Sequence, residues 1–188
     1  ALLCLLLATL TANLATAAFN PTSYARAAPQ LIGNISFYWT IDAANTTISF
    51  AVVYPTTNAW VAFGLTEPAS GSMPGADIAV GQPNSTTGLL TFDDYYATAF
   101  VTPQKDGCGP SDWTVVSTEM TSSSTVVELT RRLVAPDAAH DRSIVNDGIG
   151  TQVAFAYGDR NTPILSYHGK NVHNTRVNLF AVSSAAAR

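Results

Sequence analysis

The chain has 188 residues, of which 47% are hydrophobic and only 12% are charged, and its formal net charge at pH 7 is −4. This length suits one domain with a full hydrophobic core. The acidic balance argues against nucleic-acid binding, because the sequence shows no basic patch that would neutralise phosphates.

The N-terminal residues 1–17 are typical of a secretory signal. A short leucine-rich run, 2–7, precedes the small-x-small sequence Ala15-Thr16-Ala17, where a signal peptidase would cleave. The apolar run is too short to span a bilayer, and a buried N-terminal strand or helix is the alternative. The initiator Met and a basic leader are missing, so we expect a fragment at this end. We expect residues 18–34 to form a lead-in segment.

From residue 35 onward, short β-branched and aromatic runs alternate with turn clusters. This pattern predicts an all-β fold, an antiparallel sandwich or barrel, over residues 35–182. One helical turn is expected at 135–142, and the Ser/Ala-rich residues 183–188 are expected to form a tail or the start of a linker. The predicted strands are 35–41, 47–54, 60–65, 78–81, 89–92, 95–101, 113–120, 125–131, 152–157, 164–168 and 175–182.

Three N-x-S/T sequons, at Asn34, Asn45 and Asn84, agree with secretion and predict glycosylation on exposed turns or strand ends. Removal of the signal leaves Cys108 as the single cysteine. It is either a free thiol or pairs with a partner outside this chain. No stretch of the remaining sequence reaches membrane-spanning length, so we expect a secreted domain or one at the extracellular face of the plasma membrane.

The loop after the predicted strand 60–65 contains a residue that polar, turn-rich loops rarely need, Met73. A thioether there either packs back into the core or acts as a soft ligand for haem iron or copper. A histidine would be the natural second ligand, and the chain has three, His140, His168 and His173. The residues alone leave both interpretations of Met73 open.

The segments 71–77 (GSMPGAD), 155–158 (FAYG) and 166–171 (SYHGKN) resemble the DOMON domain, an extracellular, immunoglobulin-like β-sandwich. The resemblance covers about residues 35–180. Members of this family either hold a b-type haem between a Met and a His or bind other ligands without haem. The resemblance implies Met73 and His168 as axial ligands, with His173 as the alternative histidine. It also implies a structural role for Asp77, which we expect to hold Met73 in place.

A haem iron with both axial positions closed favours electron transfer over oxygen or substrate activation. The chain has no Cys-x-x-Cys-His sequence, so covalent c-type attachment is excluded and the expected cofactor is haem b. We expect the apolar wall of the haem pocket to come from Trp60, Phe63, Tyr157 and Tyr167.

The resemblance also implies a redox partner, often a fused domain: a transmembrane cytochrome b561, a flavin dehydrogenase or a copper monooxygenase. By itself the domain is expected to transfer electrons or bind a ligand rather than to act as an enzyme. Two alternatives stay open: a haem-free module for a sugar or another extracellular ligand, and the non-catalytic N-terminal domain of a copper monooxygenase. The Met–His pair distinguishes the haem interpretation from a pure binding module, which has no need of such a pair.

Two further predictions concern polar residues. Asp93 and Asp94 offer carboxylates for a calcium site, but we expect them to form an exposed acidic turn. His140 is expected to be a solvated loop residue.

Overall fold

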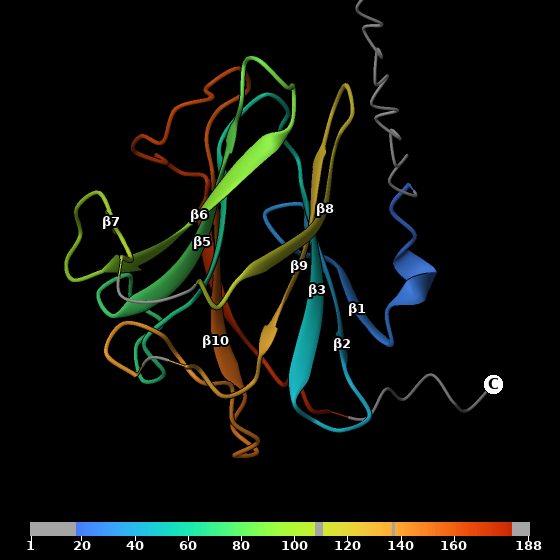
Figure 1. Ribbon diagram of the computed structural model, residues 1–188, viewed down its shortest axis with the longest axis vertical. Coiled ribbons are helices and arrows are strands. Elements are labelled where there is room, and N and C mark those ends of the chain that lie inside the picture. Colours follow the sequence, from blue (N-terminus) through green and yellow to red (C-terminus); the bar gives the residue numbers. More distant parts are fainter. Residues whose placement is uncertain (1–17, 108–110, 137, 182–188) are drawn as a thin grey trace, which may run out of the picture.

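The computed structural model describes residues 18–107, 111–136 and 138–181. The predicted signal peptide, the tail 183–188 and Cys108 therefore lie outside the described residues. Within the described part, two antiparallel sheets face each other as a β-sandwich, which confirms the predicted fold class (Figure 1). Among the described residues, no helix is long and apolar enough to cross a membrane.

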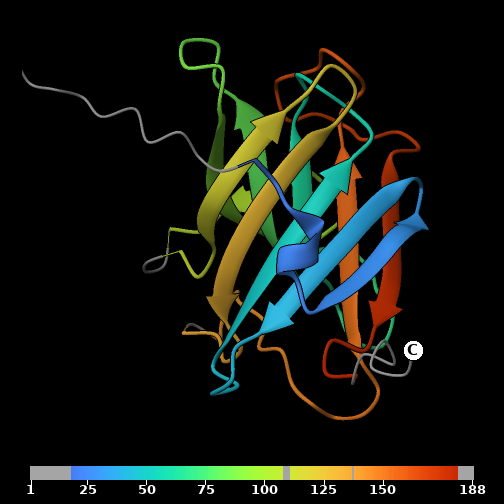
Figure 2. The same ribbon diagram turned by 90° about the vertical axis from the view of Figure 1, so that its right-hand side faces the viewer.

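One sheet has five strands in the order β1-β2-β3-β9-β8, and the other has six in the order β11-β10-β4-β5-β6-β7. Every neighbouring pair of strands is antiparallel, and Figure 2 shows the five-stranded sheet from its outer side. The strands are β1 (Arg26–Ile32), β2 (Ile35–Ile41), β3 (Thr47–Tyr54), β4 (Val61–Leu65), β5 (Ala76–Pro83), β6 (Leu90–Ala97), β7 (Gln104–Lys105), β8 (Thr114–Met120), β9 (Thr125–Arg132), β10 (Thr151–Tyr157) and β11 (Val172–Val177).

The core fills the space between the sheets because successive side chains of a strand point to opposite faces. Phe37, Phe50, Phe63 and Phe155 are all buried there, and their ring centroids lie 5.0–5.6 Å apart in five contacting pairs. Each of these aromatic pairs adds roughly 0.5–1.5 kcal/mol beyond the burial of area. The aromatic cluster therefore joins the two sheets at their centre.

The N-terminal segment is part of the sandwich rather than a lead-in. Residues 18–25 cross the outer face of the five-stranded sheet, and the chain then forms the edge strand β1 (Figure 2). The Tyr24 hydroxyl donates a hydrogen bond to Glu128 (2.7 Å), and the Phe19 ring packs edge-on against Tyr38. The sequence analysis missed this strand.

Three local predictions were wrong. The predicted strands 89–92 and 95–101 are one strand, β6, which ends at Ala97. Residues 164–168 form a loop, and the next strand of the chain is β11, which begins at Val172 and pairs with the outer side of β10. The segment 135–142 forms turns and bends where it is described, and the helical turn among the described residues is a 3-10 turn at Pro21–Ser23.

The three sequons lie in connections between strands. Asn34 and Asn45 have positive φ angles of 61° and 54° and are exposed in the turns before β2 and β3. Asn84 follows β5, and its side chain accepts a hydrogen bond from the backbone N–H of Thr86 (2.9 Å). All three positions therefore lie at the surface ends of the sandwich, where a glycan would not disrupt the core.

Candidate functional site

A cavity of about 570 Å³ opens on the outer face of the six-stranded sheet. Every second residue of the central strands points outward, and the floor that these residues form is apolar and mostly of alanine and glycine. At Gly64 a Cβ atom would lie 2.9 Å from the backbone oxygen of Asp77, so the strand cannot accept a side chain there without shifting. The floor residues are Ala62, Gly64, Ala76, Ile78, Val80, Ala154 and Ala156.

Three loops form the walls. One is the loop between β4 and β5, which carries Met73, and another is the loop between β10 and β11, which carries Leu165 and His168. The third, between β6 and β7, contributes Phe100 and Val101. Among the described residues that line the cavity there is no Asp, Glu, Lys or Arg, so the lining is largely apolar.

Local hydrogen bonds fix the Met73 loop. Glu67 accepts hydrogen bonds from the backbone N–H groups of Ala69 (3.1 Å) and Ser70 (2.7 Å), and Asn174 of β11 donates to the carbonyl of Gly71 (2.8 Å). Gly71 has a φ of +68°, a conformation that glycine adopts without strain. The thioether of Met73 is therefore carried by a loop that is tied to both its own turn and the neighbouring strand.

The loop between β10 and β11 returns over the cavity. Its Thr162 carbonyl accepts from the backbone N–H of Trp60 (3.0 Å), and Gln82 accepts from the N–H of Leu165 (2.8 Å). His168 is half-buried, and its ring centroid lies 5.0 Å from that of the adjacent Tyr167. Tyr167 itself is 84% exposed. His168 thus lines the same cavity as Met73 from a different loop.

Four of the predicted site residues line this cavity and two do not. Met73, His168, Trp60 and Tyr167 are in its lining. Phe63 points to the opposite face of β4 from the floor residues, and it is buried between the sheets. Tyr157 likewise follows the inward alternation of β10, and its ring packs 6.1 Å from that of Tyr54.

The other two histidines lie elsewhere. His173 is paired with the inward-facing Phe155, so its ring lies on the face of the sheet away from the cavity. It packs over Gly33, where a Cβ atom would come within 2.1 Å of its Nε2 atom. His140 stacks on Tyr96 with a centroid distance of 3.8 Å and pairs with Asp106, so it is not the solvated loop residue that we expected.

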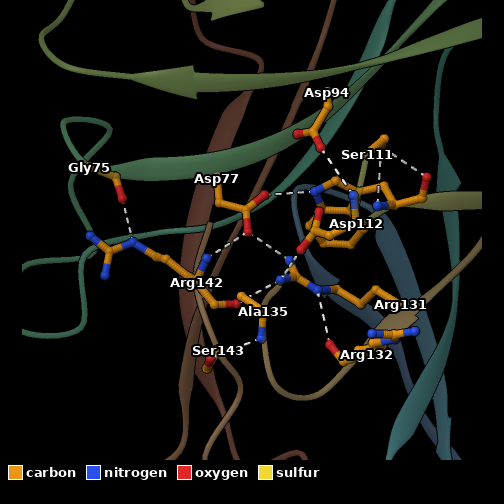
Figure 3. Close-up of polar contacts among 11 residues, drawn as sticks. Gly75, Asp77, Asp94, Ser111, Asp112, Arg131, Arg132, Ala135, Arg142 and Ser143 are labelled. Carbon is orange, nitrogen blue, oxygen red and sulfur yellow. Dashed lines mark hydrogen bonds and ion pairs between the residues drawn. The ribbon is translucent and has the colours of Figure 1, made fainter. Parts of the chain in front are cut away.

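Asp77 lies on the inward face of β5 and is fully buried. It accepts hydrogen bonds from Arg131 Nη1 (2.7 Å), Trp113 Nε1 (2.7 Å) and the backbone N–H of Arg142 (2.9 Å), as Figure 3 shows for the two arginines. The Arg142 side chain in turn donates to the carbonyl of Gly75. The expected link to the Met73 loop therefore runs through Arg142 rather than from Asp77 itself.

The sequence analysis missed most of the cavity. It found the two loop residues with metal-binding side chains, whereas the small floor residues carry no chemical signal of their own. Alternation in the strands, with Ala62, Gly64, Ala154 and Ala156 at outward positions, is the pattern that would have found them.

Two solved structures share this architecture. The cytochrome domain of cellobiose dehydrogenase from Myriococcum thermophilum has a TM-score of 0.58 and 14% identity, over 80% of this chain and 78% of that chain. The cytochrome b domain of pyranose dehydrogenase from Coprinopsis cinerea has a TM-score of 0.56 and 15% identity, over 80% of both chains. At these identities the likeness shows the fold.

No curated protein matches the sequence. The family model of the DOMON domain matches residues 31–158, which is more than half of the chain. The chain therefore belongs to the DOMON domain family.

Proposed function

We propose that this domain binds a b-type haem in the cavity through Met73 and His168 and transfers single electrons. The observation that carries the proposal is that these two residues, far apart in the sequence, line one cavity. A thioether and an imidazole are both ligands of haem iron in cytochromes.

The cavity fits a large, flat and mostly apolar group. Its volume of about 570 Å³ lies within the range of cofactor sites, roughly 300–1,000 Å³. Five of the seven floor residues are alanine or glycine, which leave room for the group, whereas larger side chains there would fill the space. A sugar fits less well, because apolar side chains predominate in the lining and no charged residue is among its described members, although Thr66 and Asn174 supply polar groups.

The protein's part in the chemistry is to hold and shield the group. Met73 and His168 would hold the iron from two loops, and Trp60 would form part of the apolar wall. When bound, the haem would supply one-electron oxidation and reduction, and with both Met73 and His168 as ligands it would not bind oxygen or substrate. A low-dielectric pocket with a Met ligand favours the reduced state and so raises the reduction potential.

We further propose that the domain acts outside the cell, secreted or at the extracellular face of the plasma membrane, and exchanges electrons with a protein partner or fused domain. The neighbours named above are cytochrome domains of two dehydrogenases, which supports a dehydrogenase as the kind of partner. The leader-like residues 1–17 and the three sequons support export.

A visible absorption spectrum before and after dithionite tests the proposal, on protein produced with haem supplied. We expect the bands of a six-coordinate, low-spin b-type haem in the wild type, and their loss in Met73→Ala and His168→Ala. The matched controls are Met120→Ala and His173→Ala, which remove the same side chains outside the cavity and should keep the bands. A colourless wild-type protein, or loss of the bands in His173→Ala alone, contradicts the proposed ligation.

A further inference from the structure

Four aspartates from separate segments converge between the two sheets, on the opposite face of β5 from the cavity. They are Asp77 of β5, Asp94 of β6, Asp112 just before β8, and Asp141 in the connection from β9 to β10. One carboxylate oxygen of each lies within 4.8 Å of the corresponding atoms of the other three. Figure 3 shows three of them, Asp77, Asp94 and Asp112, around Arg131.

The positive charge within the cluster comes from Arg131. Its side chain is fully buried and forms ion pairs with Asp77 (2.7 Å) and with Asp112. The other nearby arginine, Arg142, directs its guanidinium to the carbonyl of Gly75. Four carboxylates thus face one buried guanidinium, which leaves an excess of negative charge in the described interior.

Two of the buried carboxylate oxygens lack a partner. Asp94 Oδ1 and Asp112 Oδ1 are buried and accept no hydrogen bond from any described residue. The other oxygen of Asp94 accepts a long hydrogen bond, 3.4 Å, from the backbone N–H of Asp112. Both residues are only 8% exposed, so these oxygens are largely shielded from bulk solvent. Buried polar groups are normally satisfied, and an unsatisfied carboxylate oxygen is among the most costly to bury.

The cost of this arrangement is also visible in its acid–base chemistry. Burial, reinforced by the Asp77 carboxylate, raises the pKa of Asp94 to about 6 and that of Asp141 to about 6. Burial raises the pKa of Asp112 to about 8, although the Arg131 guanidinium acts in the opposite direction. The interior therefore disfavours the ionised carboxylates unless another positive charge is present.

We propose that this cluster binds a divalent cation, and that the cation is calcium. Ca²⁺ takes oxygen ligands at roughly 2.3–2.6 Å, so two oxygens bound to the same ion lie at most about 5 Å apart. The observed limit of 4.8 Å meets this condition without movement of the chain. The cluster contains no thiol or imidazole, the ligands that zinc and copper favour. Mg²⁺ is less suitable, because it requires near-octahedral ligands at about 2.0–2.1 Å.

Calcium would satisfy the two free oxygens and join four separate segments of the chain. Asp77 and Asp94 belong to adjacent strands of the six-stranded sheet. Asp112 and Asp141 belong to the connections β7–β8 and β9–β10, which run between the two sheets. An ion that binds only the folded chain raises its thermal stability. The site is separate from the haem cavity, and its test does not depend on haem binding.

Calcium titration of the purified chain, first treated with EDTA, tests the proposal by thermal unfolding. At a Ca²⁺ concentration about 100 times the dissociation constant, we expect the Tm to rise by roughly 5 °C or more. Tb³⁺ provides a direct probe, because Trp113 donates to Asp77 and its excitation should sensitise terbium luminescence. Excess Ca²⁺ should abolish that luminescence.

The variants Asp94→Asn and Asp141→Asn should each weaken Ca²⁺ binding by about 10-fold or more, because each removes one charged ligand. Neither residue pairs with Arg131 in an ion pair, so both variants should fold, which circular dichroism checks. Asp93→Asn is the matched control: it removes the same charge from the adjacent residue, which pairs with Lys105 at the surface, and should leave binding unchanged.

A wild-type protein whose Tm does not change at about 10 mM Ca²⁺, well above the weak end of calcium sites, would overturn the proposal. Equal loss of binding in Asp93→Asn and Asp94→Asn would also overturn the proposal, because the overall negative charge of the protein, and not the buried cluster, would then attract the ion. If Asp94→Asn raises the Tm in EDTA and Ca²⁺ has no effect, the carboxylates share protons instead of a cation.

Discussion

Replacing Arg131 with methionine tests whether its buried ion pairs hold the two sheets together. The guanidinium forms ion pairs with Asp77 and Asp112 and also donates to the carbonyl of Arg142 (2.7 Å). Methionine has similar length but no charge, so the substitution leaves the carboxylates buried without their partner. Breaking one side of a buried ion pair costs roughly 3–5 kcal/mol, so we expect a loss of about 4 kcal/mol of unfolding free energy.

This loss is a large part of the total stability of such a domain, roughly 5–15 kcal/mol, and corresponds to a fall in Tm of about 10 °C. Urea unfolding in EDTA measures it without a cation that would replace the lost charge. Arg131→Lys keeps the charge but loses the two-pronged geometry, so its loss should be intermediate. Lys105→Met, which breaks the exposed pair with Asp93, should be indistinguishable from the wild type. A loss below about 1 kcal/mol in Arg131→Met would refute the reasoning, because it would mean that the carboxylates are not buried as charges.

Three other predictions follow from the buried residues. Phe63→Leu should lower the unfolding free energy by about 1 kcal/mol and leave the haem bands unchanged, because the ring packs between the sheets; altered bands would contradict this placement. Tyr54→Phe should cost about 1 kcal/mol in urea unfolding, because the buried hydroxyl donates to the carbonyl of Ala62 (2.8 Å); no loss would indicate that this bond adds nothing. In EDTA, the unfolding free energy should rise as pH falls from about 8 to about 5. The pKa values of Asp94 and Asp112 are raised in the folded state above about 3.8, so the folded state takes up protons before the unfolded chain does. A urea midpoint that falls over this pH range refutes the assignment.

The sequence predicted the strands that carry a strong pattern and failed where neighbours decide the structure. Strand β1 contains two alanines and Pro29, which have low strand propensity, and a register shift interrupts it between Ala28 and Ile32. Its pairing with β2 makes it a strand, and proline is tolerated because β1 is an edge strand. Residues 164–168 show the opposite case: they have a strand-like composition but no strand edge beside them, because β11 occupies that edge of β10.

The lining of the cavity was predictable where a residue type is rare, and the aspartate cluster was unpredictable because it depends on strand register. Met73 is conspicuous in a polar loop, and the resemblance pointed to His168 as its partner. By contrast, Asp93 and Asp94 were expected to form an exposed turn, whereas both lie in β6, and Asp94 is buried because it is paired with the inward-facing Ala79. No local pattern in the sequence indicates that register.

Strand β5 connects the two proposed sites because its residues alternate between them. Ala76 and Ile78 point outward to the floor of the cavity, whereas Asp77 points inward to the cluster of aspartates. Immediately before β5, the carbonyl of Gly75 accepts a hydrogen bond from the Arg142 side chain. The backbone N–H of Arg142 donates to Asp77. A cation at the cluster would therefore fix the start of β5, from which the Met73 loop extends. Removal of calcium should then weaken haem binding while leaving the Met73 and His168 side chains intact, a dependence that a haem titration in EDTA and in Ca²⁺ measures directly.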